Sequence, residues 1–317
     1  MIKILSPSRS LEITKVQIEA GADEIYLGVD MDDFNIYSFG GRFKKMNGIQ
    51  TQLHSYDELR ENVEYCKQHN VDLQLTANMH YVPRELEKHY LEFIKTAVDI
   101  GVDQLIISNM GLIRLVREAG INTYIVAGSF TFIPNSEHVR MLKDLGVNRV
   151  VLPHATKISE INTIKDKVPD MDIEIFALIG GGNNCGRCMM FHAPIRRDIG
   201  PGCRAKYKLD YDGKTYEDVK FLDAAADCAL CSMKELADAG VNSLKIVGRE
   251  NANDVVMPKF TEIFYQYREG MLAGKERNEI KKCLDDNGIT WKMVWEPKFC
   301  ANGKCKFNPT KVTNSYI

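Results

Sequence analysis

Short apolar runs and amphipathic stretches alternate along the chain, and the junction between them follows one repeated pattern. In six copies an amphipathic stretch ends at Gly or Asn, a small apolar residue and then Asp or Asn follow, and an apolar run begins. Residues 19–28 and 238–248 are the first and last copies. Gly and Asn readily adopt the left-handed conformation that ends a helix, and strands covered on both faces are apolar without alternation. The pattern therefore predicts repeated helix-then-strand units and a parallel sheet.

With two further apolar runs, at 2–5 and 173–178, the repeats give eight expected strands. The full set is 2–5, 24–28, 72–77, 104–108, 123–127, 149–152, 173–178 and 243–247. Helices are expected at 9–20, 55–69, 84–100, 110–119, 136–145, 157–167, 231–239 and 253–272. Eight alternating units favour an α/β fold of the (β/α)8 TIM-barrel type. An open doubly wound sheet is the alternative, but no Gly-x-Gly-x-x-Gly motif follows the first strand.

The 317 residues suit one large domain, because barrels of this class commonly exceed about 200 residues. We predict that residues 1–272 form the barrel and that residues 273–317 are a polar, Lys-rich, peripheral extension. Two connections, 29–54 and 179–230, are longer than the loops that are usual in compact domains. Both would leave the carboxyl ends of strands, which is the face where barrel enzymes carry their chemistry.

The charges of the chain nearly balance, with 41 Lys and Arg against 43 Asp and Glu and a net charge of −2. This balance argues against a strongly basic nucleic-acid binder, although a local basic patch would fit the same total. No apolar run reaches the length of a membrane span, and the short apolar run at the N-terminus is no secretory signal. We therefore expect a cytoplasmic protein, whose cysteines stay reduced.

Five of the nine cysteines fall in the long loop after the seventh strand or directly behind it. Cys185 and Cys188 form one C-x-x-C pair, Cys228 and Cys231 form a second, and Cys203 lies between the pairs. Clustered, reduced cysteines are typical of metal or redox ligands. By spacing alone, two such pairs suit a four-thiolate zinc site, although they lie further apart than in a zinc ribbon. An iron–sulfur cluster also takes four thiolates and tolerates wider spacing, so both kinds of site remain open.

Several segments resemble the collagenase-like (U-32) peptidase family. They are residues 5–12, 20–28 and 239–249, together with Glu174-Ile-Phe176 and the following Gly186-Arg-Cys188. The resemblance implies a TIM barrel with a 4Fe-4S cluster that supports oxygen-independent hydroxylation. The substrates would be ubiquinone precursors or RNA bases, with prephenate as the oxygen donor. The peptidase label of the family is older, and no motif in this chain would explain proteolysis.

The resemblance also implies a set of cluster ligands. Cys188 matches the cysteine of the family's Gly-Arg-Cys motif, Cys203 matches the next cysteine, and Cys228 matches the one ahead of the last strand. Cys185 is a substitute for the first family cysteine, which usually lies further ahead of that motif. The expected ligands are therefore Cys185, Cys188, Cys203 and Cys228, with Cys231 in reserve.

Three residues near strand ends are candidates for substrate contacts. His154 follows the sixth strand and suits a general acid or base, or a substrate contact, with a structural role as the alternative. Lys245 lies in the eighth strand and Arg249 follows it, and together they suit an anionic ligand such as a dicarboxylate. A structural ion pair is the alternative for these two. A polar pocket is also expected from the strand-end residues Asn78, Ser108, Asn109, Ser129 and Thr131.

Two more cysteines, Cys300 and Cys305, lie near the C-terminal end of the chain. We expect them to belong to a disordered tail, because exposed polar ends of chains are commonly disordered. A second metal site is the alternative for this pair.

The expected function is that of an iron–sulfur TIM-barrel enzyme that hydroxylates a small molecule or an RNA base without oxygen, or performs a related redox modification. It would bind a small anionic substrate or oxygen donor such as prephenate, and a protein of the same family could be its partner. One alternative is a peptidase or other hydrolase with a zinc-type cysteine site. The other is an accessory subunit that carries the cluster for a second protein.

Overall fold

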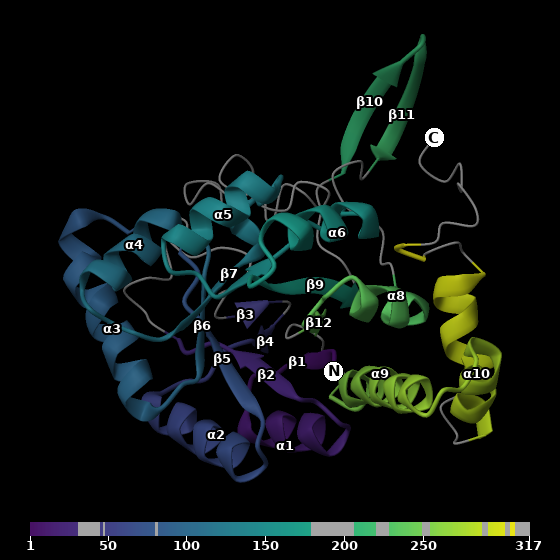
Figure 1. Cartoon of the computed structure of the whole chain (residues 1–317), viewed down its shortest axis with the longest axis horizontal. Helices are drawn as coiled ribbons and strands as arrows, with labels where there is room; N and C mark the ends of the chain where they lie inside the picture. Colours follow the sequence, from purple (N-terminus) through teal and green to yellow (C-terminus); the bar gives the residue numbers. More distant parts are fainter. Residues whose placement is uncertain are drawn as a thin grey trace.

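Eight parallel strands close into one barrel in the computed structural model, which confirms the predicted fold (Figure 1). The structure describes residues 1–30, 45–46, 48–79, 82–178, 206–219, 228–248, 254–286, 291–301 and 305–307. The barrel strands, in spatial order, are β1 (Lys3–Pro7), β2 (Glu24–Leu27), β5 (Asp72–Thr76), β6 (Gln104–Ile107), β7 (Tyr124–Ala127), β8 (Arg149–Val151), β9 (Asp172–Leu178) and β12 (Ser243–Ile246). The barrel closes where β12 pairs with β1. Each strand bound lies within two residues of its predicted position.

Helices cover the outside of the barrel and connect one strand to the next (Figure 1). They are α1 (Leu11–Glu19), α2 (Tyr56–Gln68), α3 (Glu87–Ile100), α4 (Met110–Glu118), α5 (Ser136–Asp144), α6 (Ile158–Lys167), α8 (Met233–Asp238) and α9 (Val256–Leu272). Ser10, Ser55 and Asn135 start three of these helices, because each side chain accepts a hydrogen bond from the backbone N–H three residues later. Gly101 ends α3 at a φ of 100°, a conformation that favours glycine.

The Asp or Asn of the repeat has a structural role that its position in the sequence did not reveal. In four copies its side-chain oxygen accepts a hydrogen bond from the backbone N–H of the second residue of a neighbouring strand, at 2.8 or 2.9 Å. The pairs are Asp23 with Ile4, Asp103 with Leu73, Asn148 with Ile125, and Asn242 with Ile173. The residue that leads into one strand therefore also holds the start of the preceding strand of the barrel.

Apolar side chains pack on both faces of the barrel wall. Because successive side chains of a strand point to opposite faces, one set lines the inside of the barrel. This inner set is Leu5, Tyr26, Ile106, Val126, Val151 and Phe176. The alternate positions, such as Ile4, Ile25 and Leu73, belong to the larger core between the strands and the helices. Burial on both faces explains why the strands show little polar alternation in the sequence.

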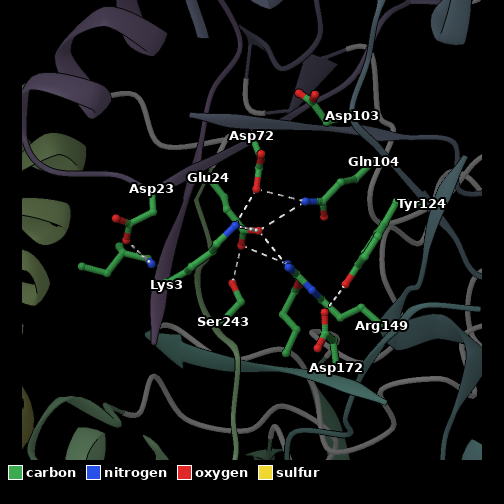
Figure 2. Close-up of polar contacts among 12 residues, drawn as sticks. Lys3, Asp23, Glu24, Asp72, Asp103, Gln104, Tyr124, Arg149, Asp172 and Ser243 are labelled. Atoms are coloured by element: carbon green, nitrogen blue, oxygen red, sulfur yellow. Dashed lines mark hydrogen bonds and ion pairs between the residues drawn. The ribbon is translucent and has the colours of Figure 1, made fainter. Parts of the chain in front are cut away.

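The first residue of every barrel strand joins one polar network at the amino-terminal end of the barrel, which we call the amino-terminal ring (Figure 2). Its members are Lys3, Glu24, Asp72, Gln104, Tyr124, Arg149, Asp172 and Ser243. Arg149 donates two hydrogen bonds to the Glu24 carboxylate, at 2.8 and 2.9 Å, and the Ser243 hydroxyl donates to it at 2.7 Å. Lys3 lies 3.6 Å from Glu24 and 2.5 Å from Asp72.

The other members of the ring belong to β6, β7 and β9, and they are Gln104, Tyr124 and Asp172. The Gln104 amide donates to both Glu24 and Asp72 at 3.4 Å. The Tyr124 hydroxyl donates to Asp172, and the Tyr124 ring lies 5.5 Å from the Arg149 guanidinium. Polar side chains from all eight strands therefore meet at one end of the barrel.

Glu24 is fully buried, so its charge depends on the partners that surround it. Burial by itself raises the pKa of the Glu24 carboxyl, but Arg149, Ser243 and Lys3 outweigh it and the net shift is downward. Burial likewise opposes the charge of Arg149, yet Glu24 and Glu174 raise the pKa of its guanidinium overall. Each charge at the centre of the ring is thus stabilised by its neighbours and would be costly without them.

The chain continues beyond the barrel in ordered segments. α10 (Arg277–Asp286) packs against α9, and a π-helical segment, Trp291–Cys300, follows (Figure 1). Trp295 is buried, and its ring packs edge-on against Phe260 and Phe264 of α9 at centroid distances of 5.7 and 6.2 Å. The expectation of a disordered tail around Cys300 is therefore wrong, because a buried aromatic side chain anchors this segment to the barrel.

Short hairpins occur within both long connections. β3 (Lys45–Met46) pairs with β4 (Ile49–Gln50), and β10 (Tyr207–Tyr211) pairs with β11 (Lys214–Val219). The second hairpin projects away from the barrel (Figure 1). Among the helices that the structure describes, none is long and apolar enough to cross a lipid bilayer.

The amino-terminal ring can be tested by replacing its central cation. Arg149→Met leaves Glu24 and Glu174 without the buried guanidinium that they share. We expect the free energy of unfolding to fall by about 3–5 kcal/mol, the usual loss when one member of a buried ion pair is removed. Arg140→Met is the matched control, because Arg140 pairs with Glu137 on the surface and should matter little. Chemical denaturation measures both variants, and equal losses would contradict the prediction.

Candidate functional site

Polar side chains gather at the carboxyl ends of β5 and β6. The Ser108 hydroxyl donates a hydrogen bond to the Asn78 side-chain oxygen at 2.7 Å, and both residues are buried. Thr131 donates to the Ser108 carbonyl oxygen at 2.9 Å. A Cβ added at Gly128 would lie 2.3 Å from the Ser108 hydroxyl, so glycine lets the backbone pass beside the pair. Three of the five predicted pocket residues are therefore brought together.

The other two predicted pocket residues have different surroundings. The Asn109 side chain accepts hydrogen bonds from the backbone N–H groups of Gly111 and Leu112, which makes it the N-cap of α4. Ser129 begins the short 3-10 turn Ser129–Thr131 that follows β7. The capping role of Asn109 explains its side chain by local structure, without a ligand.

His154 lies at the carboxyl end of the barrel, as its position after the sixth strand predicts. Its side chain is buried, and its ring centroid lies 6.1 Å from that of Phe176, one of the residues that line the inside of the barrel. The ring therefore sits over the interior of the barrel near β9. A role for His154 in substrate binding or proton transfer stays a prediction.

Lys245 is paired with a carboxylate inside the barrel. Its Nζ lies 2.9 Å from the Glu174 carboxylate and 4.4 Å from the centroid of the Tyr26 ring. Both members of the pair are buried, and Glu174 also lies 3.5 Å from Arg149. The structural ion pair that was the alternative for Lys245 is thus present. Arg249, its predicted companion, lies outside the described residues.

Glu174 is a central residue that the sequence analysis did not single out as a site residue. It connects the amino-terminal ring, through Arg149, to Lys245 on the neighbouring strand β12. The signal that could have revealed it is the acidic residue inside the otherwise apolar run 173–178. A carboxylate within a strand that is buried on both faces needs a buried cation, so it predicts a partner elsewhere in the barrel.

Cys228 lies beside the carboxyl end of β9. Its backbone forms an antiparallel bridge with Leu178, and the N–H of Ala229 donates to the Ala177 carbonyl oxygen at 2.8 Å. The Cys228 sulfur accepts a hydrogen bond from the Leu230 N–H at 3.4 Å. Burial raises the pKa of this thiol, although the Leu230 N–H and the Trp295 indole act in the opposite direction.

Of the other four predicted cluster ligands, the described residues include Cys231 alone. Cys185, Cys188 and Cys203 lie outside the described residues. Cys231 is half-buried, and its carbonyl oxygen accepts a hydrogen bond from Arg277 at 2.6 Å. Within the described ranges, no three His, Cys, Asp or Glu side chains are arranged so that they could hold a single metal ion.

Comparison with known proteins identifies the class to which this barrel belongs. The sequence model of peptidase family U32 matches residues 9–291. The chain therefore belongs to this family, as its motifs suggested.

Two relatives and one solved structure show how this chain compares with other proteins. It is 27% identical over 311 residues to tRNA hydroxylation protein P1 of Bacillus subtilis (strain 168), which covers 91% of this chain and 70% of the relative. It is 28% identical over 260 residues to a 23S rRNA 5-hydroxycytidine synthase of Escherichia coli (strain K12), covering 78% of this chain and 36% of that enzyme. The structure of the U32 peptidase Mk0906 superposes with a TM-score of 0.50 at 12% identity, over 78% of this chain and 93% of that one, and supports the fold alone.

The ion pair inside the barrel gives a second prediction. Lys245→Met leaves Glu174 buried beside Arg149 alone, and we expect the free energy of unfolding to fall by about 3–5 kcal/mol. Adding Glu174→Gln should recover part of this loss, because the double variant no longer buries a carboxylate that has lost its contact with Lys245. A double-mutant cycle from chemical denaturation measures the coupling. Strictly additive losses would show that the pair contributes nothing to stability.

Proposed function

We propose that this chain hydroxylates an RNA base without molecular oxygen, using a 4Fe-4S cluster bound at the carboxyl end of the barrel. The observation that carries the proposal is the match over 91% of the chain to a protein named for tRNA hydroxylation. A second relative is named for the synthesis of a hydroxylated base in ribosomal RNA. The position of Cys228 at the face where barrel enzymes bind their substrates supports the same proposal.

The surroundings of Cys228 fit a thiolate ligand of an iron–sulfur cluster. Cys228 is buried at the carboxyl end of β9, and its sulfur accepts a hydrogen bond from the backbone N–H of Leu230 at 3.4 Å. Hydrogen bonds to cysteine sulfurs are a common means of tuning such clusters. The proposal assigns Cys185, Cys188 and Cys203 as the remaining ligands, with Cys231 in reserve. When bound, the cluster would supply the electron transfer that a hydroxylation without oxygen requires.

The protein's own residues would then bind and orient the reactants. An anionic oxygen donor, for which prephenate is the example that the family resemblance implies, needs a cation at the carboxyl end of the barrel. We assign Arg249 and Lys245 to this role, with Lys245 shared between the donor and Glu174. His154, buried beside Phe176, is the candidate for holding or accepting a proton there. A base drawn out of the RNA would enter at the same face.

The ligand assignment predicts a distinct pattern of iron loss. Serine in place of Cys185, Cys188, Cys203 or Cys228 should lower the iron and sulfide content of anaerobically purified protein, because a cluster needs soft thiolate ligands. Cys231→Ser should leave both contents nearly unchanged, and Cys66→Ser, a buried thiol on α2, is the control. If Cys203→Ser is silent and Cys231→Ser removes the metal, the two C-x-x-C pairs form the site. That result would favour the zinc-type hydrolase.

The proposed reaction can be tested on RNA from cells. Deleting the gene should remove a hydroxylated nucleoside from total tRNA or rRNA, and mass spectrometry of digested RNA would detect the loss. The wild-type gene should restore the nucleoside, whereas a Cys228→Ser gene should not, because the cluster would be missing. An unchanged set of nucleosides in the deletion strain would contradict the proposal. If the Cys228→Ser gene restores the nucleoside, RNA hydroxylation does not require Cys228 as a cluster ligand.

A further inference from the structure

The hairpin formed by β10 and β11 stands apart from the barrel. It is a separate two-stranded sheet, and none of the residues in its two strands is buried. Asp212 and Gly213 form its turn with φ angles of 50° and 70°, as in the type I′ turns that Asp-Gly favours. Local sequence therefore explains how the hairpin forms. Packing in a core does not explain the apolar side chains that it carries.

One face of this hairpin is aromatic and apolar. Residues directly opposite each other in a two-stranded sheet share a face, and so do alternate residues of one strand. The opposed pairs on this face are Tyr207 with Val219, Leu209 with Tyr216, and Tyr211 with Lys214. We call these six residues the tyrosine face. Tyr211, next to the turn, is 67% exposed, so its ring is open to a ligand.

The charges of the hairpin are largely paired with one another and do not dominate the tyrosine face. Lys208 lies 3.9 Å from Glu217, and Lys206 lies 2.7 Å from Asp218. Lys214 is the single charged member of the tyrosine face, and it is exposed. Residues 206–219 hold three lysines and four acidic residues in all. A ligand of this face must therefore be held mainly by the aromatic rings.

The size of the tyrosine face argues against a folded protein as its partner. Strands of five and six residues are about 17–20 Å long, and a pair of strands is about 10 Å wide. The face therefore measures on the order of 200 Å², whereas a stable protein interface covers about 800 Å² on each partner. A flexible chain with flat groups that bind one at a time fits this surface better.

Unpaired nucleobases are such flat groups. Bases that are splayed out of single-stranded RNA stack on aromatic side chains, and RNA-binding sheets use exposed aromatic residues in this way. Tyr211 and Tyr216 are diagonal neighbours on the tyrosine face, which places them about 7–8 Å apart. Each ring can therefore take a base of its own, and Lys214 is placed to contact a phosphate.

The hairpin belongs to a connection that begins and ends at the carboxyl end of the barrel. The chain leaves β9 at Leu178 and returns at Cys228, whose backbone forms a bridge with Leu178. Between these points the hairpin projects outward from the barrel (Figure 1). An RNA whose reacting base lies at the carboxyl end of the barrel can therefore extend towards the hairpin.

We propose that the tyrosine face binds unpaired bases of the RNA substrate by stacking. This inference rests on the proposed RNA hydroxylation, because that function supplies RNA as the ligand. It adds a contact surface outside the barrel, which holds nucleotides other than the base that reacts. Because stacking accepts every base, the face raises the affinity for single-stranded RNA without selecting a sequence.

The test measures binding of the full chain to a fluorescently labelled, single-stranded RNA of mixed sequence by fluorescence anisotropy. Tyr211→Ala should raise the Kd about 5- to 150-fold, the range expected when one base loses its stacking partner. Tyr211→Phe should bind nearly as the wild type does, because a phenyl ring still stacks. Tyr65→Ala, the same change on α2, is the matched control and should leave the Kd unchanged. Thermal unfolding checks that each variant is folded.

Two further comparisons separate stacking from charge. Added salt should shrink the effect of Lys214→Gln but not that of Tyr211→Ala, because salt weakens phosphate contacts. A duplex of the same sequence should bind more weakly than the single strand, because its bases are already stacked on one another. The affinity for the duplex should also be insensitive to Tyr211→Ala.

An unchanged Kd for Tyr211→Ala would overturn the proposal, and so would a duplex that loses as much affinity as the single strand. If Tyr211→Ala changes the oligomeric state in analytical ultracentrifugation and leaves RNA binding unchanged, the face is a protein interface and the proposal is wrong.

The outcome is separable from that of the proposed function. If Tyr211→Ala weakens RNA binding while the gene deletion leaves all hydroxylated nucleosides in place, the tyrosine face stands and the hydroxylation falls. If the deletion removes a nucleoside and Tyr211→Ala binds RNA as the wild type does, the hydroxylation stands and the tyrosine face falls.

Discussion

The pairing of one fully buried carboxylate, Glu24, is the interaction on which the rest of the barrel depends. Its partners Arg149, Ser243 and Lys3 come from β8, β12 and β1, so the charge is satisfied only when these strands stand in the observed register. A buried charge without its partners costs several kcal/mol. Any other closure of the sheet would carry this cost. The amino-terminal ring thus makes barrel closure specific, while the apolar layers supply the bulk of the burial.

The polar contacts that hold the barrel together are concentrated at its amino-terminal end. The strand starts are tied to one another by the ring and by the Asp and Asn side chains of the repeat, such as Asp23 and Asn242. The carboxyl ends therefore do not need to hold the barrel together. The carboxyl ends can therefore carry polar residues for binding or catalysis, as is usual for enzymes with this fold. Asn78, Ser108 and His154 are such residues. Glu174 links the two ends by contacting both Arg149 and Lys245.

The carboxyl end is also where distant parts of the chain converge. Cys228 reaches β9 from the long connection, and the C-terminal segment reaches Cys228 through Cys305 and Lys306. Trp295 anchors this segment to the barrel, because its ring packs against Phe260 and Phe264 of α9. Cys228, which we propose as a cluster ligand, lies at this point of convergence.

The sequence by itself determined the order and bounds of the barrel strands, the closed barrel and the family. These features rest on local signals: left-handed Gly and Asn at helix ends, two-sided apolar runs, and short motifs such as the one around Cys188. Tertiary structure alone decided that Lys245 pairs with Glu174, that the first strand residues form one ring, and that Cys305 lies beside Cys228. These contacts join residues far apart in the chain. Such pairs leave no periodic signal in the sequence, because their partners are chosen by how the strands close and not by the neighbouring residues.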